Sequence, residues 1–124
     1  MGALAVDIVS GGTSAGSAQA INGRVGTGIA AAGTIITDAT DLRATVNVIS
    51  TVAASTAGVQ LPSMMIGDQC EVYNNGANAV KVYPDQSTVA INTLSAGSSV
   101  NLAINTGMMF RKTSATQIWA FLSA

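Results

Sequence analysis

Short β-prone runs separated by turn residues recur along most of this chain, and no helical hydrophobic period lasts a dozen residues. The clearest pair is Gln69–Asn74 and Val80–Tyr83, two runs rich in β-branched and aromatic residues. Between them lies the turn-forming cluster Asn-Gly-Ala-Asn at residues 75–78. This arrangement predicts a β-hairpin.

The side chains of this predicted hairpin set its register, because a strand places alternate residues on opposite faces. If Val72 lies opposite Val82, one face is dry and holds Cys70, Val72, Val80 and Val82. The other face is mixed and holds Glu71, Tyr73, Lys81 and Tyr83. We expect Glu71 and Lys81 to form a solvated ion pair on that mixed face, near the two tyrosines.

Other runs predict further strands before the hairpin. In residues 44–52, Val46, Val48 and Val52 are expected on one side of an extended run and Ile49 on the other. Residues 58–62 form a short extended piece that Pro62 stops, since proline cannot donate to a central ladder.

The last third of the chain predicts one alternating strand and a second hairpin. Val100, Leu102 and Ile104 are expected to face the core. The final hairpin turns at residues 113–116 and packs Met108 or Phe110 near Ile118, Trp119 or Phe121. We expect Trp119 to complete the core near the carboxyl end. The regular spacing of short strands predicts an all-β fold, a β-sandwich or jelly roll.

The 124 residues fit one compact module preceded by an arm. Residues 1–33 are dominated by Gly, Ala, Ser and Thr, so they have little apolar surface to offset the entropy of ordering. We expect an extended N-terminal arm there, ordered against a neighbouring molecule, and a β-module in residues 34–124. Leu4, Val6 and Ile8 could add one strand, and residues 35–43 could form either a strand or a short helical turn.

Charge is scarce in this sequence. Five basic and six acidic residues make up 9% of the chain, against about a quarter in ordinary globular domains. So few charges favour extensive burial in a homo-oligomer or larger assembly, although a surface of Ser, Thr, Asn and Gly is the alternative. The basic residues are scattered and the net charge is −1, which argues against nucleic-acid binding.

The residue types also restrict the chemistry. The chain has no histidine, so Ser-His-Asp and Cys-His catalysis and His-ligated zinc are excluded. Asp38 and Asp41 have the spacing of turn or cap residues, and Asp68 is expected to accept a hydrogen bond from a turn amide. The single Cys70 is expected in the core. We therefore predict no enzyme activity and no catalytic, cofactor-binding or metal-binding residues.

The first residues and the two long uncharged segments of the sequence do not predict contact with a membrane. The first residues lack a basic region, and Asp7 interrupts their apolar run, so they do not form a secretory signal. Residues 44–67 and 86–110 carry no charge, but polar residues interrupt both segments. We therefore expect no transmembrane helix.

The segment GVQLPSMMIGDQCEVYNNGANAVKVYPDQSTVAIN, followed by a late Ser-Ala-Thr and Trp119, resembles a β-rich module of structural proteins of tailed bacteriophages. The resemblance covers residues 46–121 and does not include the arm. It is carried by Gly58, Leu61, Pro62, Gly67, Asp68, Asn75, Gly76, Val82, Tyr83 and Pro84. All of these are turn or packing residues, so they specify a fold rather than a site.

This resemblance implies a capsid decoration (cement) protein. Such a protein would be a non-enzymatic homotrimer on the capsid exterior, bound to the major capsid protein. The alternative is the attachment or tip domain of a phage fibre, spike or baseplate, with glycan binding as a further option. The candidate surface contact residues are Tyr73, Lys81 and Tyr83.

Overall fold

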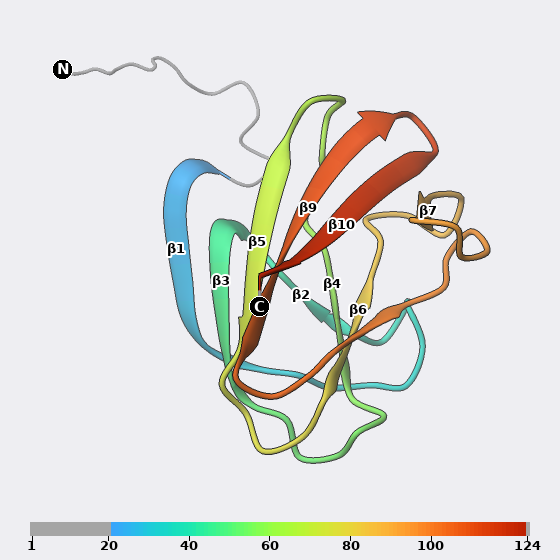
Figure 1. Cartoon of the computed structure of the whole chain (residues 1–124). Coiled ribbons are helices and arrows are strands. Elements are labelled where there is room, and N and C mark those ends of the chain that lie inside the picture. Colours follow the sequence, from blue (N-terminus) through green and yellow to red (C-terminus); the bar gives the residue numbers. More distant parts are fainter. Residues whose placement is uncertain (1–20, 124) are drawn as a thin grey trace, which may run out of the picture.

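The computed structural model describes residues 21–123, which form ten strands and no helix (Figure 1). The strands are β1 (Ile21–Ala30), β2 (Thr40–Asp41), β3 (Ala44–Thr51), β4 (Gly58–Gln60), β5 (Gln69–Asn74), β6 (Val80–Tyr83), β7 (Ala90–Ile91), β8 (Val100–Leu102), β9 (Thr106–Ser114) and β10 (Gln117–Ser123). The all-β prediction is confirmed. Within these residues there is accordingly no helix of the length and apolarity needed to cross a bilayer.

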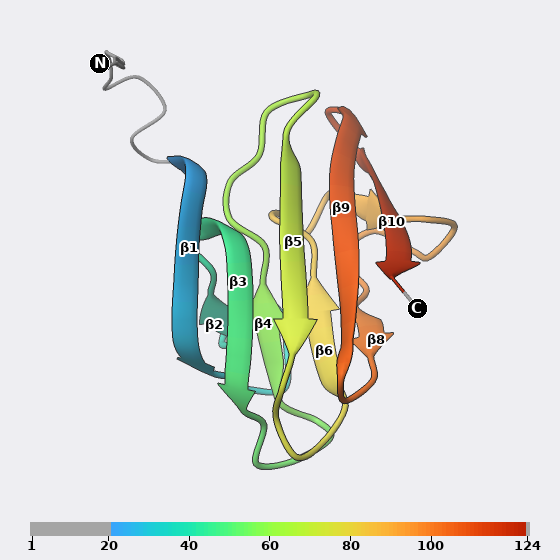
Figure 2. The same ribbon diagram turned by 60° about the vertical axis from the view of Figure 1, so that its left-hand side comes forward.

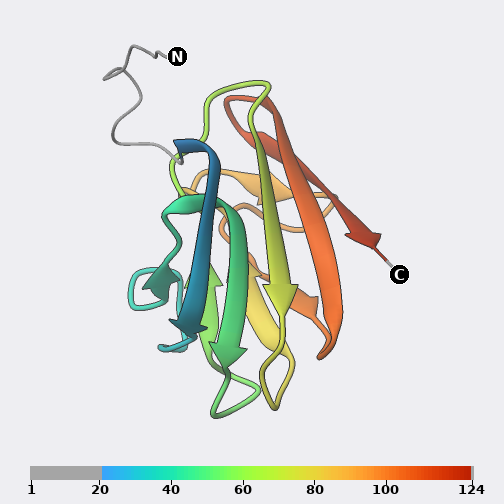
Figure 3. The ribbon, with the colours of Figure 1, turned by 90° about the vertical axis from the view of Figure 1, so that its left-hand side faces the viewer.

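The strands form two sheets that lie face to face (Figures 2 and 3). One sheet has the order β1-β3-β5-β9-β10-β7, and the other has the order β2-β4-β6-β8. Successive strands from β1 to β6 alternate between the two sheets, and each strand from β3 to β6 pairs in parallel with the strand two positions earlier. Residues 21–83 are therefore wound like a short β-solenoid.

Among the named strands, antiparallel pairing begins with β8 and β9. A jelly roll is built from antiparallel strands throughout. The jelly-roll part of the prediction is therefore not supported by this strand order. The reason is that the loops within residues 21–83 carry the chain across to the other sheet instead of turning it back beside the preceding strand.

The predicted hairpin between Gln69–Asn74 and Val80–Tyr83 is wrong, although both strands have the predicted bounds. β5 lies between β3 and β9, whereas β6 lies between β4 and β8 in the other sheet. The loop between them is held against β3: the Asn75 N–H donates to the Ile49 carbonyl and the Asn78 amide to the Val52 carbonyl. These bonds direct the chain from one sheet to the other.

Gly76 permits this crossing. A Cβ at residue 76 would lie 2.7 Å from Val52 Cγ2 and 2.9 Å from the Val52 backbone nitrogen, closer than side chains pack. The loop can therefore approach the end of β3 only because residue 76 has no side chain.

The core lies between the two sheets. Cys70, Val72, Val80 and Val82 are fully buried there, so their predicted burial is confirmed, but they come from two different sheets and do not share one sheet face. Phe110 and Ile118 lie in the same core, and β9 and β10 form the predicted second hairpin. Residues 58–60 form the short predicted strand before Pro62.

Two core predictions at the carboxyl half are wrong. Trp119 is 41% exposed, because it alternates with the inward-facing Ile118 in β10. Ile104 is 45% exposed because β8 ends at Leu102, before the predicted alternation is complete.

The predicted sides of β3 are confirmed, since Val46 and Val48 lie on one side of the sheet and Ile49 on the other. Asn47 and Ile49 are fully buried, whereas Val46 and Val48 are only partly buried on the opposite side of the sheet. Val52 is buried beyond the end of the strand. The buried side contains Asn47 between two valines, which the usual pattern of apolar residues facing inward does not predict.

The predicted arm extends too far along the chain. β1, which falls inside residues 1–33, pairs with β3 in the six-stranded sheet, and Ala31 joins the core. Main-chain hydrogen bonds of the parallel ladder hold this Gly-rich strand, which needs few large side chains. Leu4, Val6 and Ile8 lie outside the described residues.

Candidate functional site

Tyr73, Lys81 and Tyr83, the candidate contact residues, do not come together in the structure. Tyr73 is partly exposed on β5 in the six-stranded sheet, whereas Lys81 and Tyr83 belong to β6 in the four-stranded sheet. Tyr83 is buried, and its hydroxyl donates to the Thr34 carbonyl at 3.0 Å. The three residues therefore cannot form one binding surface.

The expected ion pair between Glu71 and Lys81 is also absent from the described residues, since their strands lie in different sheets. Instead, the Tyr73 hydroxyl donates a hydrogen bond to the Glu71 carboxylate. This hydrogen bond, with a smaller contribution from desolvation, raises the pKa of Tyr73. Glu71 and Tyr73 thus form a polar pair among the side chains of the six-stranded sheet.

The side of the six-stranded sheet that faces away from the core is largely apolar, and we call it the outer face. Strand register aligns one row of side chains across five strands, and this row consists of Val25, Val46, Glu71, Met109 and Phe121. Neighbouring rows add Val48 with Tyr73, and Arg111 with Trp119. Phe121 is 61% exposed and Val25 is 58% exposed. Contiguous exposed apolar residues of this kind mark interaction surfaces.

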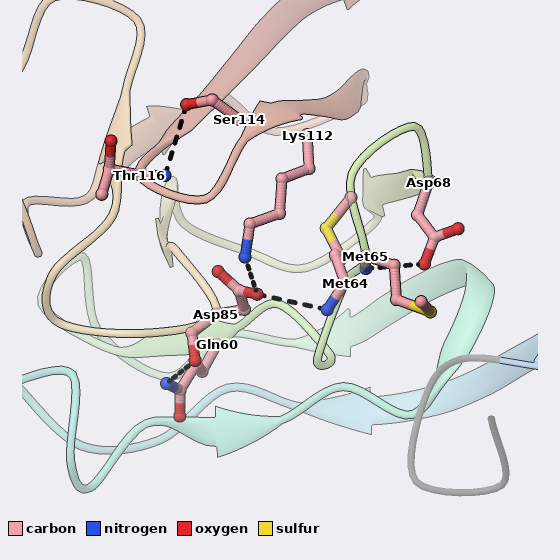
Figure 4. A network of polar contacts seen from close by, with 8 residues as sticks. All are labelled: Gln60, Met64, Met65, Asp68, Asp85, Lys112, Ser114 and Thr116. Carbon is pink, nitrogen blue, oxygen red and sulfur yellow. Dashed lines mark hydrogen bonds and ion pairs between the residues drawn. The ribbon is translucent and has the colours of Figure 1, made fainter.

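A buried ion pair connects the two sheets on the other side of β9 (Figure 4). Lys112 Nζ lies 2.9 Å from Asp85 Oδ2, and both side chains are almost completely buried. The same carboxylate oxygen accepts a hydrogen bond from the Met64 N–H at 3.1 Å, and the Gln60 amide donates to the Asp85 carbonyl. Asp85 Oδ1 has no partner in the part of the chain that the structure describes.

The surroundings of this pair assign it a structural role. It ties β9 to the end of β6 and to the loop before β5. Across residues 21–123, no three Cys, Asp or Glu residues gather closely enough to hold a metal ion. Sequence reasoning missed the pair, although Lys112 has the same strand phase as Phe110, two residues earlier, and that phase points to the core.

Two of the other carboxylates organise turns. Asp38 Oδ1 accepts hydrogen bonds from the N–H groups of Thr34 and Ile35, so residues 34–39 form a turn before the short strand β2. Asp68 Oδ2 accepts from the Met65 N–H at 2.8 Å, as predicted for this residue. Asp38 is thus a turn residue rather than half of a catalytic pair with Asp41.

Cys70 lies in the core, as predicted. Its thiol is fully buried beside Asn47 and the Ala44 carbonyl. Desolvation raises the pKa of Cys70 to about 12, with a smaller contribution from the Glu71 charge. The thiol is therefore protonated and unreactive at neutral pH.

A pocket of about 250 Å³ opens between β1 and β2, the end strands of the two sheets. It is lined by Arg24, Val25, Gly26, Ile29, Asp41, Arg43, Ala44 and Asn47. The sequence did not predict this pocket, because it depends on β1 lying beside β3. Sequence reasoning also did not select Arg24, Arg43 or Asn47 as site residues.

No family model, curated protein or solved structure matches this chain. The residues that carry the resemblance to phage structural proteins can nevertheless be located in the fold. Gly76 lies against Val52, and Asp68 holds a turn. Gly58 lies against Tyr83, because a Cβ at residue 58 would be 2.7 Å from the Tyr83 ring. These are packing and turn roles, as the sequence predicted for them.

Proposed function

We propose that this chain is a structural virion protein, a β-sandwich module that decorates and stabilises a phage capsid as a homotrimer. In this role it works through contact area on the capsid exterior, against the major capsid protein, and performs no bond-making chemistry. The observation that carries the proposal is the outer face of the six-stranded sheet.

The outer face has the composition of a protein interface. Its central row combines Val25, Val46, Met109 and Phe121 with one acid, Glu71. Arg111 in the next row supplies one base, so the face can pair its two charges across a contact. Interface centres are depleted of charge and enriched in aromatic residues and Met. Burying such a face removes the apolar surface that the charge-poor sequence leaves uncovered.

The structural roles of four charged residues also support a function that depends on contact. Asp38 and Asp68 hold turns, and Asp85 and Lys112 pair in the interior. Each of these groups stabilises the fold. A two-sheet body with a broad apolar face is suited to contact with neighbouring subunits.

The first test is molecular mass in solution, followed by capsid binding. Analytical ultracentrifugation should give a trimer for the natural chain and a monomer for Phe121→Glu, which places a charge in the outer face. Ser63→Glu is the matched control, because Ser63 is exposed outside the outer face and its substitution should leave the mass unchanged. A natural chain that stays monomeric at high concentration would contradict the homotrimer.

The second test mixes the purified protein with undecorated capsids and images them. We expect density at the three-fold or quasi-three-fold positions with the natural chain and Ser63→Glu, and none with Phe121→Glu. If the protein is a trimer but does not bind undecorated capsids, the self-association is supported and the decoration role is contradicted.

The second candidate is an attachment or tip domain of a fibre, spike or baseplate that binds glycans. Exposed aromatic side chains on one face favour it, since Tyr73 and Trp119 are both accessible to a sugar ring. Tyr83 is buried and cannot take part. A glycan array distinguishes the two candidates: hits that disappear with Trp119→Ala support the attachment domain, and an array without hits dismisses it.

A further inference from the structure

The pocket between β1 and β2 contains a buried acceptor without a donor. Asn47 Nδ2 donates to the Ala44 carbonyl at 2.8 Å and to the Glu71 carbonyl at 3.3 Å. Because carbonyl oxygens only accept, these two bonds determine which end of the amide is the nitrogen. Asn47 Oδ1 is therefore the other end, and it has no partner among residues 21–123.

Gly26 leaves space beside this oxygen. A Cβ at residue 26 would lie 3.5 Å from Asn47 Oδ1, 3.4 Å from the Ala44 Cβ and 3.6 Å from Ile29 Cδ1. All three distances are ordinary or nearly ordinary contacts, so an added methyl group would fill the space without displacing its neighbours. A molecule that enters here meets an acceptor and satisfies it by donating a hydrogen bond.

The rim of the pocket is cationic. Arg24 and Arg43 are both exposed, and neither forms an ion pair with another described residue. Asp41 is the one acid of the lining, so the rim has a net charge of +1 from two guanidinium groups and one carboxylate. Guanidinium groups bind carboxylates with paired hydrogen bonds, which makes an acidic ligand the expected choice.

We propose that this pocket binds a small hydroxylated carboxylate of the size of a sugar acid. One hydroxyl of the ligand donates to Asn47 Oδ1, and its carboxylate lies between Arg24 and Arg43. Asp41 accepts a hydrogen bond from a second hydroxyl. The volume of about 250 Å³ is below the range of about 300–1,000 Å³ typical for drug-sized ligands, which favours a single sugar ring.

Isothermal titration of the full-length protein with glucuronate tests this site, with glucose and acetate as comparison ligands. Glucuronate should give saturable one-site binding that weakens with added salt, because the guanidinium contacts are exposed. Glucose lacks the carboxylate and acetate lacks the hydroxyls, so each should bind at least about tenfold more weakly. Glucose that binds as tightly as glucuronate would overturn the role of the two arginines.

Variants locate the site. Gly26→Ala fills the space beside Asn47 Oδ1 and should weaken glucuronate binding at least about tenfold, and Arg43→Gln should do the same. Thr27→Ala is the matched control on β1, since Thr27 does not line the pocket, and it should bind normally. Thermal unfolding verifies that each variant is folded. Titrations without saturation, or equal binding by the natural chain and Gly26→Ala, would overturn the proposal.

This inference is independent of the assembly proposal. The pocket lies at the side where β1 and β2 end the two sheets, and of its lining only Val25 also belongs to the outer face. A monomer that binds glucuronate would keep the ligand site and contradict the homotrimer. A trimer that does not bind glucuronate would support the homotrimer and contradict the ligand site.

Discussion

Lys112 from β9 and Asp85 after β6 form a buried ion pair of 2.9 Å that joins the two sheets. The pair must compensate the cost of removing two charges from water. The hydrogen bond from the Met64 N–H to the same carboxylate helps to do so.

Removing the cation alone should therefore be strongly destabilising. Lys112→Met leaves the Asp85 carboxylate buried without its partner, and we expect a loss of about 3–5 kcal/mol in the free energy of unfolding. Lys112→Met combined with Asp85→Asn removes both charges and keeps an acceptor for the Met64 N–H, so it should recover most of this loss. Urea unfolding measures both variants.

The matched control for this experiment is Lys81→Gln. Lys81 lies on β6, away from the outer face, and forms no ion pair with another described residue, so its replacement should change the free energy of unfolding by less than about 0.5 kcal/mol. If Lys112→Met is as mild as Lys81→Gln, the ion pair does not stabilise the fold.

The crossing loop before β6 should be intolerant of a side chain at residue 76. Gly76→Ala places a Cβ 2.7 Å from Val52 Cγ2 and 2.9 Å from the Val52 backbone nitrogen, so the loop or the end of β3 must shift. We expect about 1–3 kcal/mol of destabilisation, measured by thermal or urea unfolding. Gly26→Ala is the comparison, since its Cβ contacts begin at 3.4 Å, and it should unfold close to the natural chain. Equal stability of the two variants would contradict the tight approach of the loop.

Cys70 should make the stability depend on alkaline pH. Its pKa is raised from 9.0 to about 12 in the folded chain. The raised pKa contributes stability that is fully present below pH 9 and is lost as the pH rises toward 12, because the unfolded thiol ionises first. The stability difference between the natural chain and Cys70→Ala should therefore shrink by about 2 kcal/mol between pH 8 and pH 10.5.

Comparing the natural chain with Cys70→Ala at each pH cancels the other titrating groups. Tyr73, whose pKa is also raised, is the main one to control, and Tyr73→Phe should retain the effect of Cys70. A difference between natural chain and Cys70→Ala that is constant with pH would show that the thiol is accessible to water.

The boundary of the module is tested by truncation. A chain beginning at Thr34 lacks β1 and the core residue Ala31, and it exposes the edge of β3. Its urea midpoint and its m-value should both fall, because less surface is buried in the folded state. A chain beginning at Ile21 keeps every described strand and serves as the control. Identical unfolding curves for the two truncations would restore the boundary at residue 33.

Much of the local structure could be predicted from alternation, but the pairing of strands could not. The bounds of β5 and β6 and the inward faces of Val72 and Val82 follow from period-two patterns within each run. Their separation into different sheets depends on contacts of the loop with Ile49 and Val52, more than twenty residues away. A turn-forming sequence between two strands is equally compatible with a crossing loop and a hairpin.

The same dependence on distant contacts explains why the candidate site residues were predicted wrongly. Tyr73 and Tyr83 could be brought together only by the hairpin, so the error in pairing separates them. Asn47 and Lys112 are polar residues at inward-facing positions, and local pattern assigns such residues to the surface. Their partners, the Glu71 carbonyl and Asp85, come from distant strands and loops and are not visible in the sequence around them.

The alternating winding of β1 to β6 also determines how this body could change in length. Each consecutive pair of strands contributes one rung to both sheets, and each rung contacts mainly the rungs beside it. An additional pair placed before β1 would extend the stack while the interior around Phe110 and Leu102 stayed as it is. Growth by whole rungs would make the molecule taller without making it thicker.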